Sequence, residues 1–171
     1  RYDYDLDKDG YIGMQYESIE SKGDIHLKID SLNKAWVEYP DGNLVPVLSK
    51  GRQIRQRKSF SSFLAAESFD DSINKLIMTK TMGDLAEWTL DANWNRLSRK
   101  RVRLKSDEFY ELEELFDMDF NRDSITGRNW KVIDNMGSEK LLVDQDSGYG
   151  WVQSSDGSIV DIRNRGRRVK A

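Results

Sequence analysis

Along most of the chain, apolar and polar residues alternate in short segments separated by turn residues. Alternation with a period of two is typical of β-strands that bury one face. The stretch Pro40-Asp41-Gly42-Asn43 separates two such segments, and its proline and glycine favour a tight turn. We therefore predict strands over residues 16–21, 24–30, 35–39, 44–48, 63–68, 73–79, 85–90, 149–153 and 159–162.

One segment carries a helical period instead. Ser106 is a good N-cap residue, and the acidic Asp107 and Glu108 after it suit the positive end of a helix dipole. The apolar residues that follow recur three or four positions apart and form one face: Phe109, Leu112, Leu115 and Phe116. The predicted fold class is α+β, mainly antiparallel β, with about one helix per repeat.

The repeat is visible when the chain is compared with itself. Residues 2–13 align with residues 116–127 at an offset of 114, and one inserted residue later moves the offset to 115. The matched positions beyond the first segment include Ile19 with Ile133, Gly23 with Gly137, Leu27 with Leu141, Asp30 with Asp144 and Trp36 with Trp151. The alignment predicts an imperfect internal repeat, with residues 1–115 as a full unit and residues 116–171 as the first half of a second.

Each copy begins with an acidic loop that fits calcium. Calcium takes six to eight oxygen ligands, and acids at alternate positions of a tight loop can direct their oxygens inward. Both loops match the first part of the EF-hand pattern, D-x-[DN]-x-[DN]-G, in which a backbone carbonyl supplies the next ligand. The predicted ligands of Ca²⁺ are Asp5, Asp7, Asp9 and the carbonyl of Tyr11 in one loop, and Asp119, Asn121, Asp123 and the carbonyl of Ile125 in the other.

The strongest ligand of that pattern is absent from its usual place. The last position of an EF-hand loop carries a bidentate acid, but Tyr16 and Trp130 occupy it here, and Ser124 replaces the glycine of the second loop. Four nearby acids are candidates to complete the shell: Asp3, Glu20, Asp117 and Asp134. The alternative is a pair of solvated, metal-free turns, but two loops in one register favour a weak calcium site of the extracellular kind.

Composition narrows the function classes. The chain has no cysteine, which excludes disulfides, thiolate zinc sites and cysteine nucleophiles. It has no apolar run long enough to cross a membrane, so we predict no membrane insertion. His26 is the only histidine, and no nucleophile elbow or phosphate-binding loop occurs, so the sequence predicts no enzyme. A glycosidase pair among the many carboxylates stays open. The acidic start, without Met or an apolar signal segment, indicates a piece of a longer protein.

The net charge of −3 hides a basic run over residues 96–105. This run holds six basic residues and no acidic one: Arg96, Arg99, Lys100, Arg101, Arg103 and Lys105. Such a run could bind an anionic polymer, for which an acidic polysaccharide suits a surface protein better than nucleic acid does. The alternative is a solvated face that neutralises the acidic helix and loop after it.

The segment Trp88-Thr89-Leu90-Asp91-Ala92-Asn93-Trp94 resembles the W-x-L-D-x-N-W signature of a tryptophan-rich C-terminal domain family first noted in Synechocystis. The resemblance continues through the helix into the second acidic loop, over about residues 85–130. It implies a secreted or surface-exposed, often multi-repeat and calcium-binding protein, similar to large cyanobacterial proteins, and no known activity. From the residues alone, both tryptophans are expected to pack in a core. A platform for a sugar ring is the alternative.

Together these features predict a calcium-binding structural or adhesive repeat module of a secreted or cell-surface bacterial protein. Its expected partners are other repeats of the same protein or other surface components. The rival prediction is a lectin-like module that binds acidic polysaccharide through the basic run.

Overall fold

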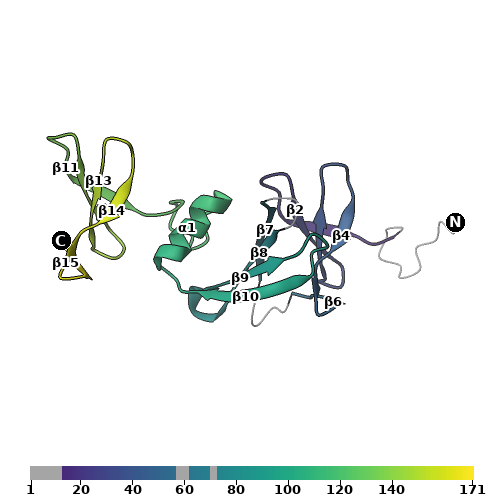
Figure 1. The fold of residues 1–171 in the computed structure, drawn as a ribbon. Helices are drawn as coiled ribbons and strands as arrows, with labels where there is room; N and C mark the ends of the chain where they lie inside the picture. The colour runs from purple at the N-terminus through teal and green to yellow at the C-terminus, as the bar shows by residue number, and fades with distance from the viewer. Residues whose placement is uncertain (1–12, 57–61, 70–72) are drawn as a thin grey trace. The chain divides into compact units, whose positions relative to one another are not determined.

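The computed structural model describes residues 13–56, 62–69 and 73–171. The chain divides into two compact units, residues 1–104 and 105–171 (Figure 1). Residues 105–115, which the sequence repeat assigns to its first copy, therefore belong to the second compact unit. Antiparallel strands dominate the described residues, and these contain one α-helix, which confirms a β-rich α+β class. No helix within the described ranges is long and apolar enough to cross a membrane.

The first described element of unit one is a four-stranded meander, in which each strand pairs with the next along the chain. Its strands are β1 (Tyr16–Glu20), β2 (His26–Asp30), β3 (Ala35–Glu38) and β4 (Leu44–Pro46), and the hairpin of β5 (Leu48–Ser49) and β6 (Arg52–Gln53) follows. The predicted turn between β3 and β4 is present. Gly42 adopts a φ of 81°, and the side chain of Asp41 accepts the N–H of Asn43 at 2.9 Å.

A second four-stranded sheet completes unit one. Its strands are β7 (Phe63–Ser68), β8 (Asn74–Thr79), β9 (Leu85–Leu90) and β10 (Arg96–Val102), with the 3₁₀ turn η1 (Thr81–Gly83) between β8 and β9. They lie in the order β10-β9-β8-β7, so β10 is an edge strand and runs beside β9 (Figure 1).

The two sheets of unit one bury a common hydrophobic core. Alternate residues of the meander face the second sheet, and the second sheet contributes aliphatic and aromatic side chains. The core residues are Ile25, Leu27, Ile29, Ala35, Val37, Val47, Phe63, Ala66, Leu76, Met78, Ala86, Trp88, Leu90 and Trp94. The alternation seen in the sequence therefore corresponds to two sheets packed face to face.

Unit two consists of one helix and a second meander. The elements are α1 (Asp107–Phe116), β11 (Trp130–Asp134), β12 (Lys140–Asp144), β13 (Gly150–Gln153), β14 (Ile159–Asp161) and the hairpin of β15 (Arg163–Asn164) and β16 (Arg167–Arg168). The predicted N-cap is confirmed, because the Ser106 hydroxyl accepts the N–H of Phe109 at 3.3 Å. The predicted apolar face is buried except at Leu115, which is exposed, and Glu113 is buried on it instead.

The second meander pairs in the same register as the first. Tyr16 lies opposite Asp30, and 114 residues later Trp130 lies opposite Asp144. Both meanders carry a bulge at the same place in their first pairing. Beyond β12 the interval becomes 115, as in the pairings of Trp36 with Pro46 and of Trp151 with Asp161. The interval found in the sequence is thus also an interval between hydrogen-bonded strand pairs.

Candidate functional site

The second acidic loop connects α1 to β11. Asp117 ends the helix in a left-handed conformation with φ of 49°, and further positive φ angles occur at Arg122 (63°) and Ser124 (72°). Ser124 stands where the EF-hand pattern has glycine, and it adopts the backbone conformation for which glycine is preferred. The loop therefore turns as the pattern requires, at the cost of left-handed strain in a serine.

The three predicted side-chain ligands of this loop all hydrogen-bond within the same tight turn. Asp119 accepts the N–H groups of Arg122 and Ser124 at 2.5 and 2.7 Å. Asn121 accepts the N–H of Asp123 at 2.9 Å and donates its amide to the Asp123 carboxylate at 2.9 Å. These bonds hold the oxygens of alternate residues within one tight turn.

Glu113 of α1 holds the loop backbone through hydrogen bonds. Its side chain is fully buried, and its carboxylate accepts the N–H groups of Phe120, Asn121 and Gly127 at 2.9, 3.2 and 3.1 Å. Burial raises the pKa of Glu113, while these three N–H groups act in the opposite direction. Sequence reasoning missed this residue. An acid at helical spacing from Phe109 and Phe116 was the available signal.

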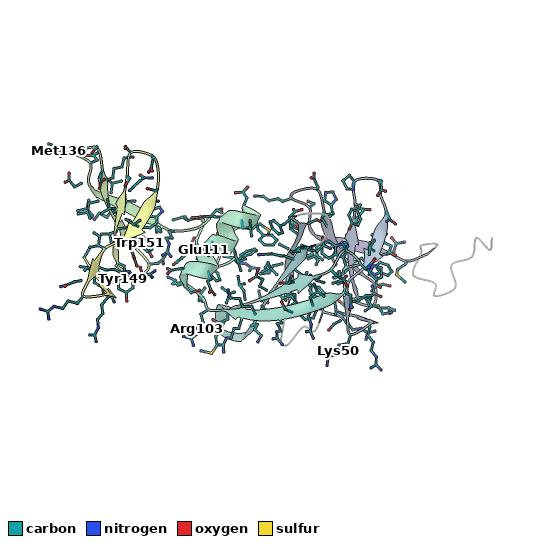
Figure 2. All side chains as sticks on the ribbon, viewed as in Figure 1. Lys50, Arg103, Glu111, Met136, Tyr149 and Trp151 are labelled. Carbon is teal, nitrogen blue, oxygen red and sulfur yellow. The ribbon has the colours of Figure 1, made fainter. Side chains whose placement is uncertain are left out.

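Three of the acids suggested as additional ligands lie within the described residues, and each has another structural role there. Asp134 lies at the far end of β11, about 13 Å along the strand from Trp130 by ordinary strand rise. Its carboxylate accepts the N–H of Met136, in the turn at the tip of that hairpin (Figure 2). Glu20 has the equivalent place at the end of β1, where it is buried and accepts the N–H of Lys22. Asp117 serves as the helix C-cap.

The first acidic loop cannot be compared in the same way. Asp3, Asp5, Asp7, Asp9 and Tyr11 lie outside the described residues. Among the residues that are described, no group of three acidic or histidine side chains is arranged to hold a metal. The second loop offers two carboxylates, one amide oxygen and the carbonyl of Ile125, a donor set that fits a hard cation in chemistry. It lacks a bidentate acid, because Trp130 starts β11 and packs edge-on against Trp151.

The basic run is divided between the two units. Arg96, Arg99, Lys100 and Arg101 lie on the edge strand β10, Arg103 follows it, and Lys105 belongs to unit two. Several of these residues make contacts within their own unit. Arg96 stacks on the Trp88 ring at 4.3 Å, Arg101 donates to Asp84 at 2.6 Å, and Lys105 pairs with Asp146. The Leu104 N–H and Arg101 together lower the pKa of Asp84.

The tryptophan segment forms the turn between β9 and β10. One oxygen of Asp91 accepts the N–H groups of Asn93 and Asn95, both at 2.9 Å. Trp94 then adopts a φ of 57°, is fully buried, and donates its indole N–H to the Tyr39 hydroxyl at 2.9 Å. Trp88 is also buried. The prediction that both tryptophans pack in the core is confirmed, and the signature is a structural motif in which the aspartate closes the turn.

This motif matches a known family. The tryptophan-rich Synechocystis species C-terminal domain matches residues 25–127, which is more than half of the chain. The chain belongs to this family. The family region ends at Gly127, so it includes the tryptophan turn, α1 and the second acidic loop, as the sequence resemblance predicted.

Other comparisons add little to the family match. No curated protein matches the chain. One solved structure, a protein of unknown function from Bacteroides caccae, matches with 11% sequence identity and a TM-score of 0.35. The match covers 94% of this chain and 47% of the other, so the chain spans about half the length of that structure.

Directly after the family region, Arg128 joins α1 to the second meander. Its guanidinium pairs with Asp107 of the helix and donates to the buried Asp144 at 3.0 Å. The same guanidinium lies over the rings of Tyr110 and Trp151, at 4.8 and 4.6 Å from their centroids. Arg128, Asp107, Tyr110 and Trp151 all line a cleft of about 430 Å³ in unit two. The bonds to both carboxylates make Arg128 a structural link, as expected of a nearly buried guanidinium between two acids.

Proposed function

We propose that this chain is a calcium-stabilised structural repeat module of a secreted or cell-surface protein. The observation that carries the proposal is the loop between α1 and β11, where Asp119, Asn121 and Asp123 hydrogen-bond within one tight turn whose backbone is held by Glu113.

The chemistry of the loop supports calcium over other ions. Each carboxylate oxygen has two lone pairs, so Asp119 can accept a backbone N–H and still ligate a cation. Oxygen donors at alternate positions with a backbone carbonyl suit calcium, and a site without the bidentate acid belongs to the weak class with dissociation constants of about 0.1–1 mM. An extracellular module meets calcium at such concentrations.

The shared strand register supports the repeat. Hydrogen bonds outside the strands follow the same interval: Val47 N–H donates to Ala35 at 3.1 Å, and Ile162 N–H donates to Gly150 at 2.9 Å, 115 residues later. Two copies of one supersecondary plan in a single chain are typical of proteins that assemble from repeats. Other repeats of the same protein, or surface components, are therefore the proposed partners.

Thermal melting in calcium and in chelator tests the proposal. With a dissociation constant of about 0.1–1 mM, 10 mM calcium should stabilise the folded chain by about 1.4–2.7 kcal/mol for each occupied loop and raise Tm by several degrees. The rise should shrink in Asp123→Asn and disappear in the double variant Asp9→Asn/Asp123→Asn. The matched control is Asp156→Asn, because Asp156 accepts the N–H of Ser158 in an ordinary turn and should leave the calcium response unchanged. A wild-type Tm that 10 mM calcium does not move refutes the calcium proposal.

Binding of acidic polysaccharide is the second proposal, favoured by the exposed basic edge of β10. Residues 97–101 of this strand are all exposed. Retention on heparin that falls steeply with salt, and is lost in Arg99→Ala/Lys100→Ala, would support it. Retention equal to that of the wild type in this variant would refute a role for the edge strand.

A further inference from the structure

The second meander has an aliphatic face that is only partly covered. We define this face by six residues, of which four are half-buried and two are exposed: Ile133, Leu141, Val143, Val152, Val160 and Ile162. Strand pairing puts them on one side, because Leu141 lies opposite Val152 and Val152 lies opposite Val160. Ile133 and Val160 are 50% and 58% exposed. An apolar patch of this kind usually marks an interaction surface.

The first meander shows what covers the equivalent face. Its corresponding positions are Ile19, Leu27, Ile29, Val37, Val45 and Val47, and all six belong to or pack against the core of unit one. Leu27, Val37 and Val47 are fully buried. The cover is the sheet β7–β10, which supplies Leu76, Trp88 and Leu90 among other side chains to the same core.

The equivalence of the two faces extends to the last residue of the chain. Gln56 N–H donates to the carbonyl of Asn33 at 2.8 Å, and Ala171 N–H donates to Gly148 at 2.9 Å. Both residues of the second bond lie 115 positions after their counterparts. The second meander and its flanking hairpin thus have the same backbone plan as the first meander, which the sheet β7–β10 covers.

The opposite face of the second meander is partly occupied within unit two. Trp151 is buried there, and Arg128 stacks on it while pairing with Asp107 of α1. Figure 2 labels Trp151 and Tyr149 on the second meander. Val132 is still exposed on that opposite face, but the aliphatic face carries the larger set of aliphatic side chains, six in all.

We propose that the aliphatic face of the second meander docks a four-stranded antiparallel sheet of the β7–β10 kind, with an apolar, tryptophan-containing inner face. This inference rests on the repeat proposed above. The described β7–β10 sheet is itself engaged with β1–β4. One end of the docked sheet meets a more polar border, since Glu139 and Ser154 replace the Ile25 and Tyr39 of the first meander.

The test adds a sheet of the β7–β10 kind to the intact chain. Residues 57–104 are duplicated directly after Ala171, at the point equivalent to Gln56, and backbone amide exchange is measured in both chains. Docking should slow exchange of the β12 and β13 amides at least tenfold and reduce the binding of a hydrophobic dye. In the extended chain, Val152→Asp should reverse both effects. Val132→Asp, on the opposite face of the same sheet and 51% exposed, should leave them intact.

Each outcome has a separate meaning. Unchanged exchange in β12 and β13, with the β11–β14 pairings still present by NMR, overturns the docking inference and leaves the repeat standing. Absence of those pairings in the unextended chain overturns the repeat itself. Protection that rises with the concentration of the unextended chain assigns the face to a second copy and overturns the sheet as its occupant. NMR of Val152→Asp in the unextended chain controls for loss of folding.

Discussion

Replacing Glu113 with alanine should loosen the acidic loop from the helix that carries it. The wild-type carboxylate is fully buried and accepts three backbone N–H groups, from Phe120, Asn121 and Gly127. The alanine variant leaves all three donors without this acceptor. The Gly127 N–H is buried and bears most of the penalty, whereas the other two are partly exposed and can bond to water.

The expected loss in free energy of unfolding follows from these three N–H donors. One buried, unsatisfied donor costs about 1–3 kcal/mol, and the two partly exposed ones add about 0.5–1 kcal/mol together. Relief from burying a carboxylate offsets part of the sum. We expect Glu113→Ala to lower the free energy of unfolding by about 2–3 kcal/mol in urea denaturation at pH 7. Glu111→Gln, an exposed acid on the same helix (Figure 2), is the control and should change it by less than about 0.5 kcal/mol.

The pH dependence gives an independent measurement. The folded-state pKa of Glu113 is raised above its ordinary value of 4.5. The folded chain therefore holds this proton more tightly than the unfolded chain does, and the stability that protonation contributes is lost as pH rises through the folded-state pKa. Relative to Glu113→Gln, the wild type should lose stability as pH rises above 4.5. A wild-type advantage that grows with pH in this range, or a Glu113→Ala variant as stable as the Glu111→Gln control, would refute the reasoning.

Three further substitutions test the long-range contacts. Trp94→Ala should cost about 3–5 kcal/mol in urea denaturation, as expected for a fully buried aromatic side chain. Tyr39→Phe, which removes only the hydrogen bond to the same indole, should cost about 0.5–1.5 kcal/mol, and equal costs would contradict the assignment of Trp94 to the core. In the first meander, at the equivalent positions, Trp36 donates its indole N–H to Asp30 at 3.0 Å. Removing the Arg128 bond in Arg128→Met should let Asp144 accept the Trp151 indole N–H in the same way, since that N–H has no partner within the described residues. Slowed exchange of that indole proton by NMR would support this rearrangement, and an unchanged resonance would contradict it.

The local features of the fold could be predicted from the sequence. The turn at Gly42 and the N-cap at Ser106 depend on residues within a few positions, and both are present. The Asp91 turn of the tryptophan signature is equally local, because one carboxylate oxygen accepts N–H groups two and four residues ahead. Strand alternation likewise follows from neighbouring residues. Short-range hydrogen bonds and periodicity need no knowledge of the remaining chain.

The shell of the candidate calcium site could be predicted only in part. Asp119, Asn121 and Asp123 hydrogen-bond within one turn because their spacing places them in the same loop. Asp134 was a reasonable candidate by sequence distance, but an extended strand carries it away from the loop, where a helix or turn would have brought it back. Glu113 has its role because it lies on the side of the helix that faces the loop, and that loop starts several positions later in the chain.

The sequence by itself determined the strand and helix periods, the turns, the acidic loops and the interval of about 114 residues between similar segments. Tertiary structure decided which polar groups bond to each other across long distances in the chain. Trp94 finds the Tyr39 hydroxyl 55 residues away, and Arg128 joins Asp107 and Asp144, which no local pattern links. The reason is that burial is a property of packed faces. A side chain's partners become fixed only when sheets and helix pack together. In the second meander the aliphatic face still exposes Ile133 and Val160 to solvent.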